Sequence, residues 1–156
     1  SHGIDISEVA ISIAIKNATK KAVRSDQFSV QSGDTHVLPY EDNYFDFVVA
    51  ESCLDSMPFD LAKLYITELK RATNGIIYAS FIGQDPTMPS DEFVVKTGHE
   101  KGTVQTVFNQ EKICKLFGTT KEKFIYFSCI DQTDCNSKKL IGKRYYVIVK
   151  CFDIEV

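Results

Sequence analysis

The chain has 156 residues, 44% of them hydrophobic and 12% aromatic, which is enough to bury one core and fits a single domain over residues 1–156. Its formal net charge of -3 argues against a general nucleic-acid binder, because phosphate binding normally needs a basic face. No apolar stretch approaches the ~20 residues needed to cross a bilayer, and the first residues lack a signal-peptide pattern. We therefore expect a cytoplasmic protein without a membrane partner.

The cysteines and the basic residues carry little functional signal. Five cysteines are an odd number, and none forms a CxxC pair, so the sequence predicts neither a zinc site nor a secreted disulfide framework. A reducing compartment and no bound metal follow from this. Basic side chains cluster near the C-terminus, and we expect them to be solvated surface: Lys138, Lys139, Lys143 and Arg144.

Two helices and three strands are predicted in the first half of the chain. Ser7 is a plausible N-cap for a helix that reaches Ala22, and residues 28–30 form a short strand. Residues 44–50 are a near-continuous apolar run, which is typical of a central strand covered on both faces. Pro58 opens a second helix that we expect to end at Asn74-Gly75, before a strand over 76–81.

The second half begins with a long polar segment. Residues 83–102 contain two prolines and little periodicity, which predicts an excursion loop on the substrate side. A strand over 103–108 follows, and then a short helix between an Asn109 cap and Gly118. Residues 124–130 and 145–152 are two further strands that are too close in sequence for a crossover helix, so they should pair antiparallel.

Strands that alternate with helices before a terminal hairpin predict an α/β layered sheet, with its ligand beyond the carboxyl ends of the parallel strands. Three places meet that rule: Asp5, the pair Asp34 and Thr35, and the segment that leaves the 44–50 strand at Ala50 and Glu51. A carboxylate at a strand end can accept hydrogen bonds from a ribose diol or an exocyclic amine. Each position also has a structural interpretation: Asp5 as a helix-capping residue, and Asp34 as an ordinary turn residue.

The order and spacing of these pieces resemble a known family. Residues 3–7 read Gly-Ile-Asp-Ile-Ser, and residues 33–49 read Gly-Asp-Thr-His-Val-Leu-Pro-Tyr-Glu-Asp-Asn-Tyr-Phe-Asp-Phe-Val-Val. Glu-Leu-Lys-Arg follows at 68–71. Together they resemble the class I S-adenosylmethionine-dependent methyltransferases, most closely the small-molecule and quinone-biosynthesis branches. The resemblance covers residues 3–82 in motifs and the rest in topology alone.

The resemblance implies a cofactor site. In such an enzyme Asp5 would hold the ribose of S-adenosylmethionine and Ile6 would pack near the adenine. Asp34 and Thr35 would contact the adenine, and Ala50 and Glu51 would lie near the amino-acid end of the cofactor.

One family element is absent from the sequence shown. The first strand of the family and its glycine-rich loop should lie upstream of Ser1, so the resemblance implies an incomplete Rossmann-like sheet, mostly parallel, with a C-terminal antiparallel hairpin. Without that central strand, the two remaining sheet fragments would have unpaired edges. A longer natural chain, a truncated chain, and a second copy that donates a strand in a homodimer remain as explanations.

The resulting hypothesis is methyl transfer from S-adenosylmethionine to a small molecule, with a protein acceptor left open and nucleic acid disfavoured. Such enzymes mainly align the acceptor and exclude water, so a catalytic base is optional; Glu51 and His99 are the candidates. A non-catalytic methyltransferase-like interaction module or partner subunit is one alternative. A nicotinamide-dependent oxidoreductase is another, since an Asp after the second strand also holds ribose there.

Overall fold

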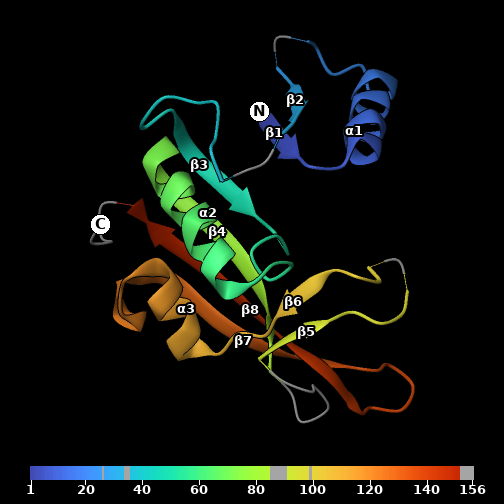
Figure 1. Cartoon of the computed structure of the whole chain (residues 1–156), viewed down its shortest axis with the longest axis vertical. Coiled ribbons are helices and arrows are strands. Elements are labelled where there is room, and N and C mark those ends of the chain that lie inside the picture. Colours follow the sequence, from blue (N-terminus) through green and yellow to red (C-terminus); the bar gives the residue numbers. More distant parts are fainter. Residues whose placement is uncertain (26, 34–35, 85–90, 99, 152–156) are drawn as a thin grey trace. The chain divides into compact units, whose positions relative to one another are not determined.

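The computed structural model describes residues 1–25, 27–33, 36–84, 91–98 and 100–151. The chain divides into two compact units, Ser1–Pro39 and Tyr40–Val156, and each is described by itself (Figure 1). Whether they act as the single domain expected from the sequence stays a prediction.

The first unit is a strand–helix–strand unit. Its strands β1 (His2–Asp5) and β2 (Ser29–Ser32) pair in parallel, with Asp5 opposite Ser32, and α1 (Glu8–Lys20) connects them. Ser7 caps α1 as predicted, because its Oγ accepts a hydrogen bond from the Ala10 N–H at 3.2 Å. The carboxyl ends of both strands therefore lie at the same edge.

The second unit is built on a four-stranded sheet in the order β3-β4-β8-β7. The pair β3–β4 is parallel, whereas β4–β8 and β7–β8 are antiparallel, so the predicted α/β sheet with a C-terminal hairpin is confirmed. Its elements are β3 (Phe45–Ala50), α2 (Phe59–Ala72), β4 (Thr73–Gly83), β5 (Glu92–Val94), β6 (Val104–Thr106), α3 (Gln110–Phe117), β7 (Phe124–Thr133) and β8 (Leu140–Lys150).

Both helices of this unit cover one face of the sheet (Figure 1). Tyr65 and Ile66 of α2 and Phe117 of α3 pack against alternate residues of β4, such as Ile77 and Phe81, in one core. Asn109 caps α3 through its Oδ1, and Gly118 ends the helix with φ 61°, as predicted.

The other face of the sheet is less covered than the sequence predicted. Phe47 is 55% exposed and Val49 is 57% exposed, and β3 is one of the two edge strands of the four-stranded sheet. The expectation that the 44–50 strand is covered on both faces is therefore wrong for the described structure. Because side chains alternate along a strand, Tyr78, Ser80 and Ile82 of β4 point toward this second face, away from Ile77 and Phe81.

Asn74 and Gly75 do not form the turn predicted after α2. The helix ends at Ala72, and both residues belong to β4, which starts at Thr73. A Cβ built on Gly75 would lie 1.9 Å from the Asp46 carbonyl oxygen. Glycine is thus required by the close approach of β3, at the point where the β3–β4 register shifts.

The predicted excursion loop also contains regular structure. Residues 92–94 form β5, which pairs antiparallel with β6 in a separate two-stranded sheet. Residues 85–90 and His99, which fall in this predicted loop, lie outside the described residues.

Candidate active site

Asp5 lies at the carboxyl end of β1, and only one of its two carboxylate oxygens accepts a hydrogen bond among the described residues. Oδ1 accepts a hydrogen bond from the Ser7 N–H at 2.8 Å, which supports the start of α1. Oδ2 has no hydrogen-bond partner among the described residues. The side chain is exposed, so this oxygen can accept a hydrogen bond from a ligand.

An exposed apolar side chain follows Asp5 directly in the sequence. Ile6 is 75% exposed directly after the strand. The Gly33 N–H, at the end of β2, donates to the Asp5 carbonyl oxygen at 3.2 Å, so the two strand ends are tied together. Asp34 and Thr35 follow Gly33 but lie outside the described residues, so their proposed adenine contacts remain predictions.

Ala50 and Glu51 mark the carboxyl end of β3. Ala50 is buried and pairs with Ala79 of β4, whereas Glu51 is exposed. Glu51 accepts a hydrogen bond from the Tyr78 hydroxyl, and this bond raises the pKa of Tyr78 to about 12. Burial adds to the shift as a smaller cause. The Glu51 carboxylate is therefore held against β4 rather than free in solvent.

Ser52 holds the chain in an unusual turn directly after Glu51. Its φ is 50°, a left-handed conformation that non-glycine residues rarely adopt. Its N–H donates to Ser80 Oγ at 3.0 Å, and its own Oγ accepts from Arg144 Nη1 at 2.7 Å. Strain of this kind persists only where surrounding contacts impose it, and it concentrates at functional sites.

Asp55 and Arg144 form an ion pair next to this turn. Asp55 Oδ2 accepts from the Ile82 N–H at 2.7 Å and lies 3.7 Å from Arg144 Nη1. The Asp55 side chain is only 1% exposed, and its Oδ1 is buried without a hydrogen-bond partner. Burial raises the pKa of Asp55 and is the largest influence on it. The hydrogen bond from the Ile82 N–H and the positive charge of Arg144 act in the opposite direction.

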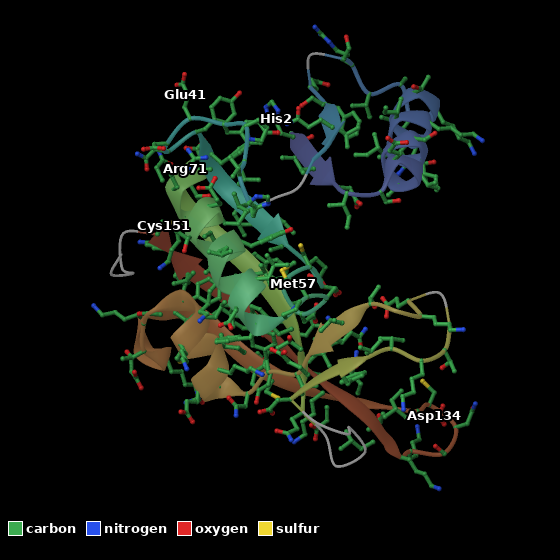
Figure 2. The ribbon with its side chains drawn as sticks, in the orientation of Figure 1. His2, Glu41, Met57, Arg71, Asp134 and Cys151 are labelled. Atoms are coloured by element: carbon green, nitrogen blue, oxygen red, sulfur yellow. The ribbon has the colours of Figure 1, made fainter. Side chains whose placement is uncertain are left out.

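The β5–β6 hairpin is attached to the segment that joins β3 to α2. The Thr106 N–H donates to the Asp55 carbonyl oxygen at 2.8 Å, and its Oγ1 donates to the carbonyl oxygen of Met57, labelled in Figure 2, at 2.6 Å. The Phe59 N–H donates to Glu92 Oε1 at 2.8 Å. Part of the 83–102 segment is thereby fixed beside the turn that carries Glu51 and Ser52.

Comparison with known proteins identifies the family. A family model described as "Methyltransferase domain" matches residues 1–135. The chain belongs to this methyltransferase family. The predicted kinship with the S-adenosylmethionine-dependent methyltransferases is thus confirmed. A search of curated protein sequences gives no significant match.

Solved structures show the same fold at low sequence identity. A SAM-dependent methyltransferase from Methanosarcina mazei is 19% identical, with a TM-score of 0.73, over 96% of this chain and 81% of that one. The 1,6-didemethyltoxoflavin-N1-methyltransferase of Burkholderia thailandensis is 12% identical, with a TM-score of 0.69, over 96% of this chain and 60% of that enzyme. The magnesium protoporphyrin IX methyltransferase of Synechocystis PCC 6803 is 18% identical, with a TM-score of 0.60, over 96% of this chain and 58% of that enzyme.

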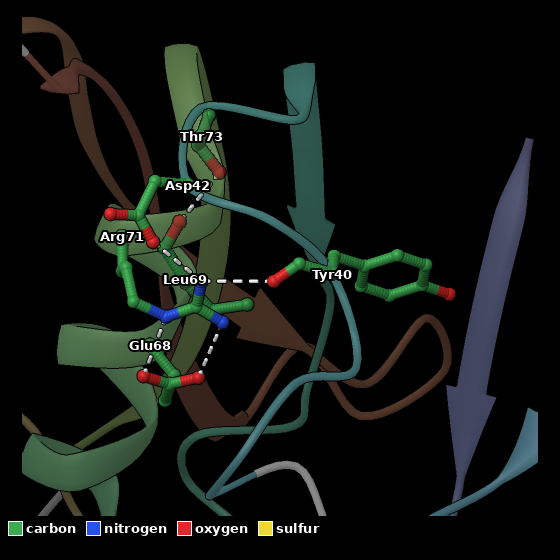
Figure 3. Close-up of polar contacts among 6 residues, drawn as sticks. All are labelled: Tyr40, Asp42, Glu68, Leu69, Arg71 and Thr73. Carbon is green, nitrogen blue, oxygen red and sulfur yellow. Dashed lines mark hydrogen bonds and ion pairs between the residues drawn. The ribbon is translucent and has the colours of Figure 1, made fainter.

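The Glu-Leu-Lys-Arg motif of this methyltransferase has a structural role (Figure 3). Arg71 donates from Nε and Nη2 to the two carboxylate oxygens of Glu68, and from Nη1 to Asp42 Oδ1 and the Tyr40 carbonyl oxygen. The Asn43 N–H donates back to the Arg71 carbonyl oxygen at 2.8 Å. The motif thus anchors the segment before β3 to the end of α2.

Sequence reasoning missed several polar residues of this methyltransferase. Arg144 was expected to be surface charge, but its side chain is 20% exposed and reaches Ser52. Asp55 and Tyr78 were not singled out. Arg144 gave little signal in the sequence, because it directly follows Lys143 in a basic segment, where charged side chains are usually exposed.

Two negative findings concern only the described parts of the methyltransferase. No group of three or more His, Cys, Asp or Glu side chains there could hold a metal ion. None of the helices among the described residues is long and apolar enough to cross a membrane.

Proposed function

We propose that this domain transfers the methyl group of S-adenosylmethionine to a small-molecule acceptor, with Asp5 as the ribose ligand. The observation that carries the proposal is the Asp5 carboxylate, which uses one oxygen to support α1 and leaves the other open at the end of a parallel strand. An oxygen so placed suits a sugar hydroxyl, and the exposed Ile6 beside it suits a flat aromatic base.

Methyl transfer mainly requires that the chain align the acceptor with the methyl group of the cofactor. When bound, the cofactor supplies an electrophilic methyl group on a sulfonium. At the carboxyl end of β3, we assign the amino-acid end of the cofactor to Ala50 and Glu51. Glu51 is the proposed acceptor of a proton from a substrate hydroxyl or amine, since Tyr78 orients its carboxylate. His99 is the second candidate for this role.

A small-molecule acceptor fits the structural neighbours and the chain itself. The Burkholderia enzyme is described with bound 1,6-didemethyltoxoflavin, and the Synechocystis enzyme is a magnesium protoporphyrin IX methyltransferase. The β5–β6 hairpin adds support, because it is bonded to Asp55 and Met57 in the segment between β3 and α2 and can shape the acceptor side. No observation favours the alternative of a non-catalytic interaction module.

Calorimetric titration with S-adenosylhomocysteine tests the proposal. We expect Asp5→Ala to weaken binding by more than about tenfold, since it removes charge-assisted hydrogen bonds of roughly 1.5–3 kcal/mol. Asp5→Asn can still accept from the Ser7 N–H, so it separates the ligand role from the helix role. Glu8→Ala is the matched control, an exposed acid in the first turn of α1. Equal affinity in the wild type and Asp5→Ala would remove the ribose assignment.

A second assay addresses the acceptor. The protein is incubated with methyl-labelled S-adenosylmethionine and a cell extract separated into low-mass and macromolecular fractions. We expect the label to enter the low-mass fraction, and to do so more slowly with Glu51→Gln. Label confined to macromolecules would contradict a small-molecule acceptor.

A further inference from the structure

Arg144 carries an unused hydrogen-bonding edge close to the strained turn after β3. Its Nη1 donates to Ser52 Oγ at 2.7 Å and approaches Ser80 Oγ at 3.5 Å. Neither Nε nor Nη2 has a partner among the described residues. A guanidinium has five N–H donors in a fixed fork, so most of its capacity is open.

The contact with Asp55 does not use up that capacity. At 3.7 Å, the separation of Asp55 Oδ2 and Arg144 Nη1 is an ion pair but too long for a hydrogen bond. Asp55 Oδ2 is instead bonded to the Ile82 N–H. Asp55 therefore offsets part of the charge and fixes the position of Arg144, while the other edge of the guanidinium remains open.

Two tyrosine side chains share the sheet face on which Arg144 lies. Arg144 pairs with Ile82 and Tyr146 pairs with Ser80, so the side chains of Arg144 and Tyr146 share the sheet face opposite α2 and α3. Tyr78 lies on the same face and binds Glu51, the proposed proton acceptor. A planar ligand can place its ring against the tyrosines and its anionic group on Arg144.

We propose that Arg144, positioned by Ser52 and Asp55, binds a carboxylate of the methyl acceptor. The inference rests on the proposed function and deepens it, since it names a carboxylate-bearing, planar small molecule as the acceptor class. A carboxylate matches the guanidinium edge with two parallel hydrogen bonds, which a neutral amide or ester cannot reproduce with the same strength. The strained turn at Ser52 holds this edge in place.

The first test is a titration of the full chain with benzoate, followed by NMR of the arginine Nε–Hε groups. The chain has three arginines, Arg24, Arg71 and Arg144, so the signals can be assigned by substitution. We expect a saturable shift of the Arg144 signal at millimolar benzoate. Arg71 is the internal control, because its Nε already donates to Glu68. Benzamide, with the same ring and no charge, should bind at least tenfold more weakly.

Variants and a cofactor titration separate the possible outcomes. Arg144→Lys keeps the charge but loses the fork, so we expect at least tenfold weaker benzoate binding by calorimetry, whereas S-adenosylhomocysteine affinity stays within twofold. S-adenosylhomocysteine binding without any benzoate-dependent shift of Arg144 would overturn the inference and leave the proposed function intact. Benzoate binding without S-adenosylhomocysteine binding would contradict the proposed function and support the anion site alone.

Two further outcomes would also overturn the acceptor assignment. If S-adenosylhomocysteine shifts the Arg144 signal and displaces benzoate, Arg144 binds the cofactor carboxylate. If inorganic phosphate shifts the signal at lower concentration than benzoate, the site takes a phosphate. The wild-type titrations decide both points, so they do not depend on the folding of any variant.

Discussion

Arg71 holds Glu68 by two parallel hydrogen bonds, Nε to Oε1 and Nη2 to Oε2, each 2.9 Å long. The same guanidinium reaches across to Asp42 and to the Tyr40 carbonyl oxygen. One side chain thus joins α2 to the segment that leads into β3. The pKa of Arg71 is raised by these carboxylates, with Glu68 as the largest cause.

We expect Arg71→Lys to lower the thermal midpoint, because a lysine cannot replace the fork that binds Glu68 and Asp42 together. Lys63→Gln is the matched control: it breaks an exposed pair with Asp60 on the same helix and should have a smaller effect. Thermal unfolding followed by circular dichroism measures both. An equal drop in the two variants would argue against an anchoring role.

Gly75→Ala should destabilise the second unit by about 3 kcal/mol, because the new Cβ would overlap the Asp46 carbonyl oxygen and force β3 and β4 apart. Gly142→Ala is the control, since the nearest atom to its Cβ is the flexible end of Gln132 at 3.2 Å. Urea unfolding gives the two free energies. A stable Gly75→Ala would mean that β3 does not approach β4 as described.

Two substitutions of Ser52 separate the effect of backbone strain from the effect of its hydrogen bond with Arg144. Alanine keeps the unfavourable φ of 50° and loses the bond from Arg144, whereas glycine loses the bond but adopts this φ without strain. We therefore expect Ser52→Gly to be more stable than Ser52→Ala by about 1 kcal/mol. Both variants should weaken benzoate binding. The reverse order of stability would show that residue 52 is not left-handed in solution.

Tyr78 gives a prediction about pH. Its hydrogen bond to Glu51 and its partial burial raise its pKa from 10.0 to about 12, so the folded state keeps the proton longer than the unfolded chain. This contribution to stability is complete below pH 10 and is lost as the pH rises toward 12. Tyrosine ring NMR should show the pKa fall toward 10 in Glu51→Gln. A wild-type pKa near 10 would contradict the Tyr78–Glu51 bond.

Local signals in the sequence were enough for elements whose ends are set by their own residues. Asn109 and Gly118 define α3 through capping geometry that involves only the helix itself. The C-terminal hairpin was predictable for the same reason, because the segment between its strands is too short for any other connection.

Elements that depend on distant partners were not predictable in this way. Gly75 was interpreted as a turn residue, because the approach of Asp46 is invisible in the local sequence. β5 is only three residues long and exists through its pairing with β6. Arg144 lies in a basic run, and its contact with Ser52 spans 92 positions of sequence.

That long separation has a consequence for how the protein assembles. The turn after β3 lies in the first half of the sequence, but Arg144, whose side chain binds Ser52 in this turn, belongs to β8 and reaches it once β8 has paired with β4. Contacts so far apart form late, because closing a long loop costs entropy before the contact can stabilise the chain. A chain in which β3 and β4 have already paired would therefore still lack the bond between Arg144 and Ser52, and the turn after β3 would be among the later parts of this unit to become fixed.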